Sequence, residues 1–269
     1  MIFVAAGTRD GREIVKMLLE RGFAVAASAA SAYGGRLLTD SCAEWFAHGK
    51  LHVNDEPLPS DAMLAYWREH DVTVVVDASH PYAVHVSKTM MSLAAETEIP
   101  YIRYERDLTQ LPVSGLQVAA DYDGAAEMAA SCGKTVFLTT GSHSLRQFTE
   151  HPALRDHRIV ARVLPTVDVI SLCAELGLQP KDIIAMQGPF SRELNRAMFA
   201  QYAADVIVTK NSGTVGGTDT KLLAAQDLGI PVVMIDRPKL AYPHLAQSVD
   251  AVLSFVEEHD GIHQKTDGD

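Results

Sequence analysis

Short apolar segments rich in β-branched residues alternate along the whole chain with segments whose apolar residues recur every three or four positions. The first pattern predicts buried strands and the second predicts amphipathic helices. Repeated alternation of this kind is typical of parallel sheets that are covered by helices on both faces. The sequence therefore predicts an α/β fold.

The first half of the chain contains the clearest of these segments. Val72–Asp77 is apolar enough to be a strand buried on both faces, and the helix that follows has a proline, Pro81, at its start. The predicted strands here are Ile2–Ala6, Phe23–Ser28, one within Glu44–Val53, Val72–Asp77 and Tyr101–Tyr104, and the predicted helices are Asp10–Gly22, Ser60–His70 and Pro81–Glu98.

A break in the pattern divides the chain into two lobes. The stretch Asp107–Gly115 has no periodicity and carries Pro112, Ser114 and Gly115, so we expect a first lobe over residues 1–114 and a second over residues 115–269. The length of 269 residues suits two lobes of ordinary size. The second lobe is expected to contain the strands Thr135–Thr139, Arg158–Leu164, Asp182–Met186, Asp205–Thr209 and Val232–Ile235 and a last helix over Ser248–Glu258.

The composition of the chain limits the kinds of partner that it is expected to bind. The formal net charge of −11 disfavours non-specific binding to nucleic acid, because the phosphate backbone attracts basic surfaces. No apolar run is long enough to span a bilayer, and the N-terminal apolar stretch stops at Gly7 without a basic segment before it. The three cysteines form no CxxC pair. We therefore expect a cytoplasmic protein with free thiols and with neither a membrane nor a nucleic acid as partner.

Ligands of parallel sheets bind beyond the carboxyl ends of the strands, so the loops at those ends are the candidate sites. Gly7, Thr8, Arg9 and Gly11 follow the first strand and precede a helix. Glycine lets a phosphate approach the backbone, and the helix N-terminus favours the negative charge. Two arginines replace glycines of the full dinucleotide fingerprint, and a tight turn without a ligand would use the same residues.

The end of the second strand bears on which dinucleotide is favoured. An NAD-binding fold usually has an acidic residue here that holds the ribose hydroxyl. This chain instead has Ser28, Ala30 and Ser31, which would not repel a 2′-phosphate. Small residues could also simply fill a crowded strand end.

Two further loops of the first lobe contain candidate residues for catalysis or ligand binding. Ser79, His80 and Pro81 follow the strand Val72–Asp77, which places His80 at the mouth of the sheet. A lone histidine is more often structural, and its spacing from His85 is poor for a metal, so we expect no metal site. After the next strand, Arg103 and Arg106 flank an aromatic residue and can bind carboxylates or form a surface salt-bridge cluster.

The second lobe shows the same distribution of small and basic residues. Lys221 lies in the first turn of a helix, where a positive charge opposes the macrodipole, so its position favours a ligand over stability. Basic residues at the strand ends of both lobes, in a chain that is net acidic, predict a large polyanionic ligand in an interlobe cleft. The candidate residues of this lobe are Thr140, Ser142, Arg162, Gln187, Ser191, Lys210, Ser212, Gly213 and Lys221.

Taken in order, these segments resemble the precorrin-6A reductase family of cobalamin biosynthesis, which includes the cobalt-precorrin-6A reductases. Single motifs are weakly specific, but the ordered set extends from the first strand to Arg237-Pro238. The segments that carry the resemblance are Gly7-Thr8, Asp77–Ala83, Arg103–Arg106, Thr139–Ser142, Gln187–Ser191, Thr209–Gly213, Gly216-Gly217 and Lys221.

The resemblance implies two Rossmann-like lobes and a nicotinamide cofactor, NADPH or alternatively NADH, held mainly by the first lobe. It implies reduction of one double bond in precorrin-6A or cobalt-precorrin-6A, an anionic corrin-precursor macrocycle rimmed by acetates and propionates. Hydride would go to one ring carbon and a proton to its neighbour. Lys210 is the first candidate for a catalytic role in this proton transfer, and His80 is the second.

Two other functions stay open on the sequence. A non-catalytic, two-lobed module that binds a nucleotide or anion would need no titratable group beside its ligand, whereas His80 and Lys210 stand at strand ends. A glycosyltransferase-like enzyme would be expected to have a metal-binding Asp-x-Asp. The motif Asp121-Tyr122-Asp123 has this spacing but lies away from the predicted strand ends.

Overall fold

The computed structural model describes residues 1–29, 31–106, 115–211 and 217–263, with side chains up to residue 260. The chain forms two compact units. The first lobe consists of Met1–Asp107 together with Lys239–Asp269, and the second lobe consists of Leu108–Pro238. In the described residues each lobe is built on a six-stranded sheet, and all the strand pairs are parallel. The predicted α/β class with two parallel sheets is confirmed.

The sheet of the first lobe has the order β12-β5-β4-β1-β2-β3. Its central strands are buried along their whole length, as their runs of apolar residues require. The strands are β1 (Ile2–Ala5), β2 (Val25–Ser28), β3 (Leu51–Asn54), β4 (Val74–Asp77), β5 (Tyr101–Tyr104) and β12 (Leu245–Ala246).

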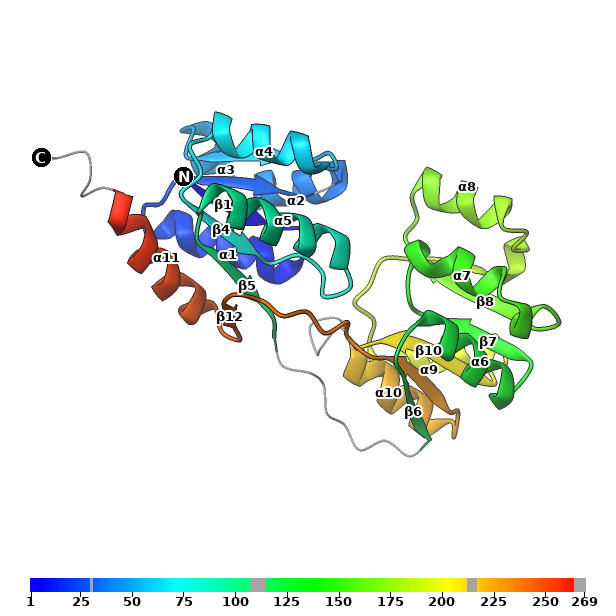
Figure 1. Ribbon diagram of the computed structural model, residues 1–269. Coiled ribbons are helices and arrows are strands. Elements are labelled where there is room, and N and C mark those ends of the chain that lie inside the picture. Colours follow the sequence, from blue (N-terminus) through cyan, green and yellow to red (C-terminus); the bar gives the residue numbers. More distant parts are fainter. Residues whose placement is uncertain (30, 107–114, 212–216, 264–269) are drawn as a thin grey trace, which may run out of the picture. The chain divides into compact units, whose positions relative to one another are not determined.

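Helices cover both faces of this sheet (Figure 1). One face packs on buried side chains of α1, α2 and α11, and the other packs on those of α4 and α5. Each of these helices presents an apolar stripe at helical spacing, such as Ile14, Val15 and Leu18 in α1. The helices are α1 (Arg9–Glu20), α2 (Ala32–Ser41), α3 (Ala43–Ala47), α4 (Ser60–Glu69), α5 (Val84–Thr97) and α11 (Val249–His263).

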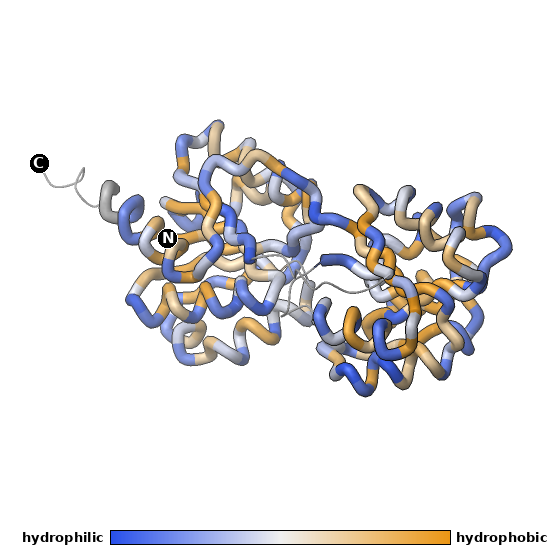
Figure 2. The backbone as a smooth tube through the Cα atoms, turned by 90° about the horizontal axis from the view of Figure 1, so that it is seen from below, coloured by the Kyte–Doolittle hydropathy of each residue, from blue (hydrophilic) through white to orange (hydrophobic). Residues whose placement is uncertain are grey.

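The sheet of the second lobe has the order β6-β11-β10-β7-β8-β9. Its central strands are also almost fully buried, and in Figure 2 the strands at the middle of each unit are mostly orange. The strands are β6 (Leu116–Ala119), β7 (Thr135–Leu138), β8 (Arg158–Val163), β9 (Ile183–Ala185), β10 (Val206–Lys210) and β11 (Val232–Ile235).

The helices α9 and α10 pack together on one face of this sheet, where Phe199 and Leu222 are fully buried. The others contribute further buried apolar side chains, among them Ala129 and Phe148. The helical segments of this lobe are α6 (Tyr122–Cys132), η1 (Ser142–Ser144), α7 (Leu145–Thr149), η2 (Pro152–Leu154), α8 (Val167–Glu175), η3 (Pro180–Asp182), α9 (Arg192–Gln201) and α10 (Thr218–Asp227).

The C-terminal segment corrects the expected extent of the lobes. Residues from Lys239 onward belong to the first lobe, although the sequence assigned 115–269 to the second. β12 pairs with β5, and α11 buries Val252, Leu253 and Val256 on the first sheet. The helix itself was predicted, but an apolar stripe does not state which sheet it covers. The predicted boundary segment, 107–114, lies outside the described residues.

Several elements differ from their predictions for local reasons. Pro81 lies in a turn closed by the Ala83 N–H and the His80 carbonyl, so α5 begins only at Val84. The segment Glu44–Val53 holds the end of a short helix before β3. The sequence also missed β6, β12 and α2, because only Ala119 of β6 is buried, β12 has two residues, and a Gly-Gly pair weakens the helical pattern of α2.

Two properties of the described ranges concern membranes and metal ions. No helix in them is long and apolar enough to cross a membrane. No group of three or more His, Cys, Asp or Glu side chains in them is arranged to hold a metal ion. The cysteines Cys42, Cys132 and Cys173 are all free. The cytoplasmic location stays a prediction.

Candidate functional site

The turn between β1 and α1 is built around Thr8, the N-cap of the helix. Its Oγ1 accepts a hydrogen bond from the Gly11 N–H at 3.0 Å and donates one to the Ala78 carbonyl at 2.9 Å. The first bond satisfies a free N–H of the helix, and the second ties the turn to the loop after β4. Gly7 and Arg9 are exposed, so the N-terminus of α1 is accessible to an anion.

Gly11 allows α1 to pack closely against the end of β1. A Cβ at this position would lie 2.8 Å from the Ala6 Cα, a backbone atom that cannot turn aside. Close packing of helix on strand is the role of the third glycine in dinucleotide-binding turns. A Cβ at Gly7 would meet only the Ala29 carbonyl oxygen, at 3.6 Å, which leaves room beside the turn.

We expect Gly11→Ala to lower the thermal stability of the protein and to weaken NADPH binding. The extra methyl must displace α1 from β1, and overpacking of this kind costs about 1–3 kcal/mol. Thermal unfolding and equilibrium binding by cofactor fluorescence measure the two effects. Lys16→Ala, on the exposed side of the same helix, is the matched control. Cofactor affinity equal to that of the parent protein would contradict a role for this packing in the site.

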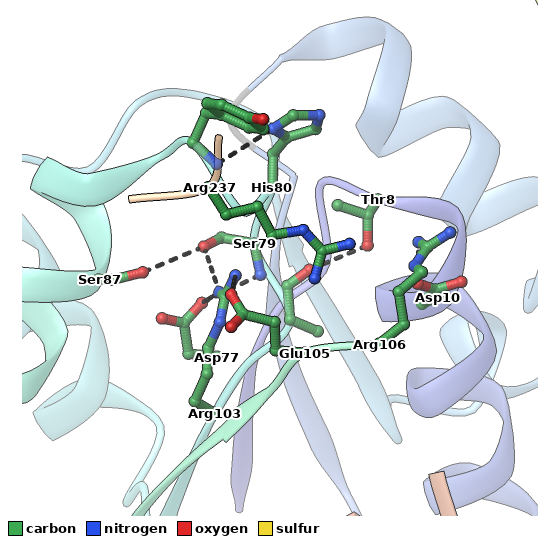
Figure 3. Close-up of polar contacts among 12 residues, drawn as sticks. Thr8, Asp10, Asp77, Ser79, His80, Ser87, Arg103, Glu105, Arg106 and Arg237 are labelled. Atoms are coloured by element: carbon green, nitrogen blue, oxygen red, sulfur yellow. Dashed lines mark hydrogen bonds and ion pairs between the residues drawn. The ribbon is translucent and has the colours of Figure 1, made fainter. Parts of the chain in front are cut away.

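Asp77, the last residue of β4, is the centre of a fully buried polar network (Figure 3). Its carboxylate accepts hydrogen bonds from the Tyr101 hydroxyl and from Arg103 Nη1, both at 2.7 Å, and from the Ser79 N–H at 3.0 Å. Burial and the neighbouring carboxylate hold the pKa of Tyr101 far above its ordinary value, so the phenol is a stable donor.

Arg103 occupies a different place from the one expected of a substrate-binding residue. Its side chain has no exposed surface; besides Asp77 it donates to Ser79 Oγ at 3.0 Å and lies over the Tyr242 ring. Burial is the largest single effect and opposes the charge, but Asp77 and the other neighbouring groups that can carry negative charge, Tyr242, Glu105 and Tyr101, together outweigh it and raise the pKa of Arg103. The predicted contact with a substrate carboxylate does not fit a buried, ion-paired guanidinium. Arg103 instead supports the loop that carries Ser79 and His80.

His80 lies at the exposed rim above this network (Figure 3). Its Nδ1 accepts a hydrogen bond from the Tyr82 N–H at 3.3 Å, and its ring contacts the Tyr82 ring at a centroid distance of 5.6 Å. Thr8 anchors the same loop from the other side through Ala78. The structure therefore brings together the predicted turn residues after β1 and the predicted loop residues after β4.

Arg106 forms an ion pair with Asp10, in the first turn of α1. The pair places a second arginine beside the glycine turn, while its contact with a substrate stays a prediction. At the end of β2, Ser28 is partly buried, and Ser31 caps α2 by accepting from the Gly34 N–H at 3.2 Å. Of the predicted cofactor residues, Ala30 lies outside the described residues.

The second lobe brings basic residues together at the carboxyl ends of neighbouring strands. β7 lies between β10 and β8, so Lys210, Thr140 and Arg162 stand at adjacent strand ends. Arg162 is buried, donates from Nη1 to Asn195 Oδ1 at 2.7 Å, and lies 4.2 Å from the centre of the Phe190 ring. Burial lowers the pKa of Arg162 to about 10.

Two lysines lie close to Arg162. Lys221, in α10, is buried, and burial together with the charges of Arg162 and Lys210 lowers its pKa to about 7, against the opposing effect of Asp219. Lys210 packs on the Tyr122 ring at 5.4 Å, and burial lowers its pKa to about 8. Buried and partly buried cations gathered at one edge of a sheet are a candidate binding site for an anion.

The remaining predicted residues of this lobe have mixed outcomes. The buried hydroxyl of Thr140 has no hydrogen-bond partner among the described residues. Ser142 is partly buried in η1, and Ser191 is exposed and caps α9 through the Leu194 N–H. Gln187 is exposed after β9. Ser212 and Gly213 lie outside the described residues.

The sequence missed the residues that orient the basic groups. Asn195 holds Arg162 and also donates to the Phe190 carbonyl at 3.3 Å, and Thr220 donates to the same carbonyl at 3.1 Å. In the first lobe, Tyr101 and Tyr242 were missed in the same way. Tyr101 and Arg103 are two residues apart in β5, so their side chains lie on the same face of the strand. This spacing could have indicated their contact.

The fold and the strand-end loops define a two-lobed α/β protein with a glycine-containing turn at a helix N-terminus in one lobe and a cluster of basic residues near strand ends in the other. The family described as precorrin-6x reductase CbiJ/CobK matches residues 1–257. The chain belongs to this family and is an oxidoreductase of cobalamin biosynthesis.

Relatives of the chain agree with this assignment. It is 40% identical over 254 residues to the cobalt-precorrin-6A reductase of Priestia megaterium, with 94% of this chain and 96% of the relative covered. It is 35% identical over 239 residues to the enzyme of that name from Salmonella typhimurium, covering 88% and 87%. The solved structure of CobK precorrin-6A reductase shares the fold, with a TM-score of 0.75, 23% identity and 96% coverage of both chains. The resemblance inferred from the ordered motifs is confirmed, and it favours a reductase over the two alternatives.

Proposed function

We propose that this protein reduces a double bond of cobalt-precorrin-6A with NADPH as the source of hydride. The relatives from Priestia megaterium and Salmonella typhimurium are named for the cobalt-containing substrate, whereas the relative from Rhodobacter capsulatus, at 25% identity, is named a precorrin-6A reductase. A precorrin-6A reductase from Rhodococcus erythropolis is 33% identical over 199 residues, so the support for the cobalt-containing macrocycle comes from the Priestia megaterium enzyme, at 40% over 254 residues.

The first lobe fits a nicotinamide dinucleotide. Gly7 and Gly11 give the close turn and close packing that a pyrophosphate needs, and Thr8 caps a helix whose N-terminus favours the anion. Ser28 and Ser31 can hydrogen-bond a 2′-phosphate, and Arg36 is exposed farther along α2. When bound, the cofactor supplies hydride to one ring carbon of the macrocycle.

The second lobe fits the acidic rim of the macrocycle, and a single observation carries this part of the proposal. Arg162 and Lys221 are both buried, and among the described residues neither has a carboxylate within ion-pair distance. Buried charges are normally paired because desolvation is costly, so a ligand carboxylate completes the site.

Hydride addition leaves electron density on the ring that a proton must neutralise. Lys210 and His80 are the candidates that the chain offers for holding this proton, and each stands directly at or after a strand end. A positioned acid contributes about 10²–10⁴-fold to a rate.

The proposal is tested by mixing the purified protein with NADPH and cobalt-precorrin-6A and following the absorbance of the cofactor at ~340 nm, the ordinary nicotinamide band. We expect stoichiometric oxidation of NADPH and a product heavier by two hydrogens. Metal-free precorrin-6A, assayed in parallel, distinguishes the two substrates. Tight binding of both ligands without oxidation would instead support a binding module.

We expect NADPH to be used at least as well as NADH. The end of β2 and the start of α2 supply Ser28 and Ser31 and no carboxylate of their own, and the acidic side chain beside them, Asp55, packs against Gly35 of α2. The comparison of kcat/KM for the two cofactors under identical conditions measures this preference. A higher kcat/KM for NADH would contradict it. Arg36→Ala, if it narrows the difference, would identify the group that binds the phosphate.

A further inference from the structure

Arg162 and Lys221 place two positive charges in a buried environment without a counter-ion. Their exposed fractions are 7% and 8%. The charged groups that act on Lys221 are Arg162 from β8, Lys210 from β10 and Asp219 from its own helix, while α9 contributes the neutral Asn195. Residues 212–216 read SGTVG and bring no titratable side chain.

The electrostatics of this cluster depend on whether an anion is bound. Two like charges removed from water destabilise each other, and a lysine can relieve the repulsion by losing its proton, whereas an arginine cannot. The pKa of Lys221, about 7, agrees with this expectation. Without an anion, Lys221 is therefore largely neutral at slightly alkaline pH.

We propose that Arg162 and Lys221 form a subsite for two carboxylates of the ligand and that Lys221 takes up a proton when they bind. The identity of the ligand as an acid-rimmed macrocycle rests on the proposed function. Each carboxylate neutralises the charge of one buried cation, so binding favours the charged form of the lysine.

Three features fit an organic polycarboxylate better than inorganic phosphate. The guanidinium of Arg162 is packed against Phe190, which makes its surroundings apolar. The buried Thr140 hydroxyl, between the strand ends of Lys210 and Arg162, has no partner among the described residues and can donate to a carboxylate. The large hydrophobic side chains of Leu164 and Met186, just after β8 and β9, are exposed and can contact the body of a ring.

The test uses uroporphyrin, a stable tetrapyrrole rimmed by acetates and propionates, as the probe. Isothermal titration at pH ~7.5, in buffers of different ionisation enthalpy, gives the number of protons taken up per ligand bound. We expect net proton uptake of up to about one proton, more of it by Lys221 than by Lys210, because the pKa of Lys221, about 7, is lower than that of Lys210, about 8.

Substitutions of Lys221 distinguish the effect of its positive charge on binding from its uptake of a proton. Lys221→Met should weaken binding about ten- to a hundredfold, the value of one charge-assisted hydrogen bond, and remove most of the proton uptake. Lys221→Arg keeps the charge but cannot gain a proton, so binding should persist with the same loss of uptake. Lys181→Met, at an exposed lysine of the same lobe, is the control and should change neither quantity.

The possible outcomes decide the proposal separately from the enzyme's activity. Binding of uroporphyrin by the parent protein without proton uptake, or uptake in Lys221→Arg equal to that of the parent protein, would overturn the linkage. A parent protein that does not bind the probe would overturn the subsite. Inorganic phosphate that matches the probe in affinity and uptake would show a general anion site and overturn the assignment to carboxylates. Oxidation of NADPH with cobalt-precorrin-6A tests the proposed function independently.

Discussion

Arg103→Met will lower the free energy of unfolding of the first lobe by about 3–5 kcal/mol, because it leaves a buried carboxylate without its partner. Asp77 and Arg103 both have no exposed side-chain surface, and their contact is a 2.7 Å ion pair. The substitution removes more than this ion pair, because Ser79 Oγ and the Tyr242 ring also contact the guanidinium. Urea unfolding measures the change.

The fluorescence of tryptophan makes this measurement specific to one lobe. Both tryptophans of the chain, Trp45 and Trp67, belong to the first lobe, so their signal follows its unfolding alone. Lys16→Met removes an exposed ion pair with Glu20 and should change stability by less than about 1 kcal/mol. A change of that small size in Arg103→Met would show that the buried pair does not stabilise the lobe.

A double substitution distinguishes the ion pair from general packing. Asp77→Leu combined with Arg103→Met removes both charges and should recover part of the lost stability, since neither partner is then buried alone. The double variant should still bind NADPH more weakly than the parent, because the loop of Ser79 and His80 has lost two of its hydrogen bonds. The double variant would thus regain stability without regaining cofactor affinity.

The sequence predicted the elements whose pattern is local and strong. β4 and α1 are recognisable because their apolar residues follow the period of the element itself. The short strands β6 and β12 lack such a pattern: β12 has two residues and exists through its pairing with β5. Which sheet the C-terminal helix covers is a long-range choice that no local pattern records.

The candidate site was predictable as far as strand ends identify it. Lys210 and Arg162 were singled out because they stand near the carboxyl ends of parallel strands, and Lys221 because a positive charge in the first turn of a helix opposes the macrodipole; their roles stay predictions. Arg103 satisfied the same rule and was misassigned, because its partner Asp77 stands on a neighbouring strand far away in sequence. Pairing between strands decides whether such an arginine supports the site or contacts a ligand.

Lys210→Met is expected to lower kcat for reduction by about 10²–10⁴-fold while the substrate remains bound, as follows when a positioned acid is removed. Lys210 ends β10, beside the anion site, and methionine keeps most of the stem that packs on Tyr122. Single-turnover kinetics at saturating substrate separate this effect from weaker binding. Lys181→Met is the control on the exposed surface of the same lobe.

The pH dependence gives an independent check on Lys210. Burial lowers its pKa to about 8, and an acid must carry its proton to act, so kcat/KM of the parent protein should fall as the pH rises through about 8. Loss of a carboxylate-binding group alone would raise KM and leave kcat nearly unchanged. Full kcat in Lys210→Met at saturating substrate would therefore exclude its catalytic role. His80→Ala would then be the variant expected to lose kcat, since His80 is the second candidate for the proton and lies exposed after β4.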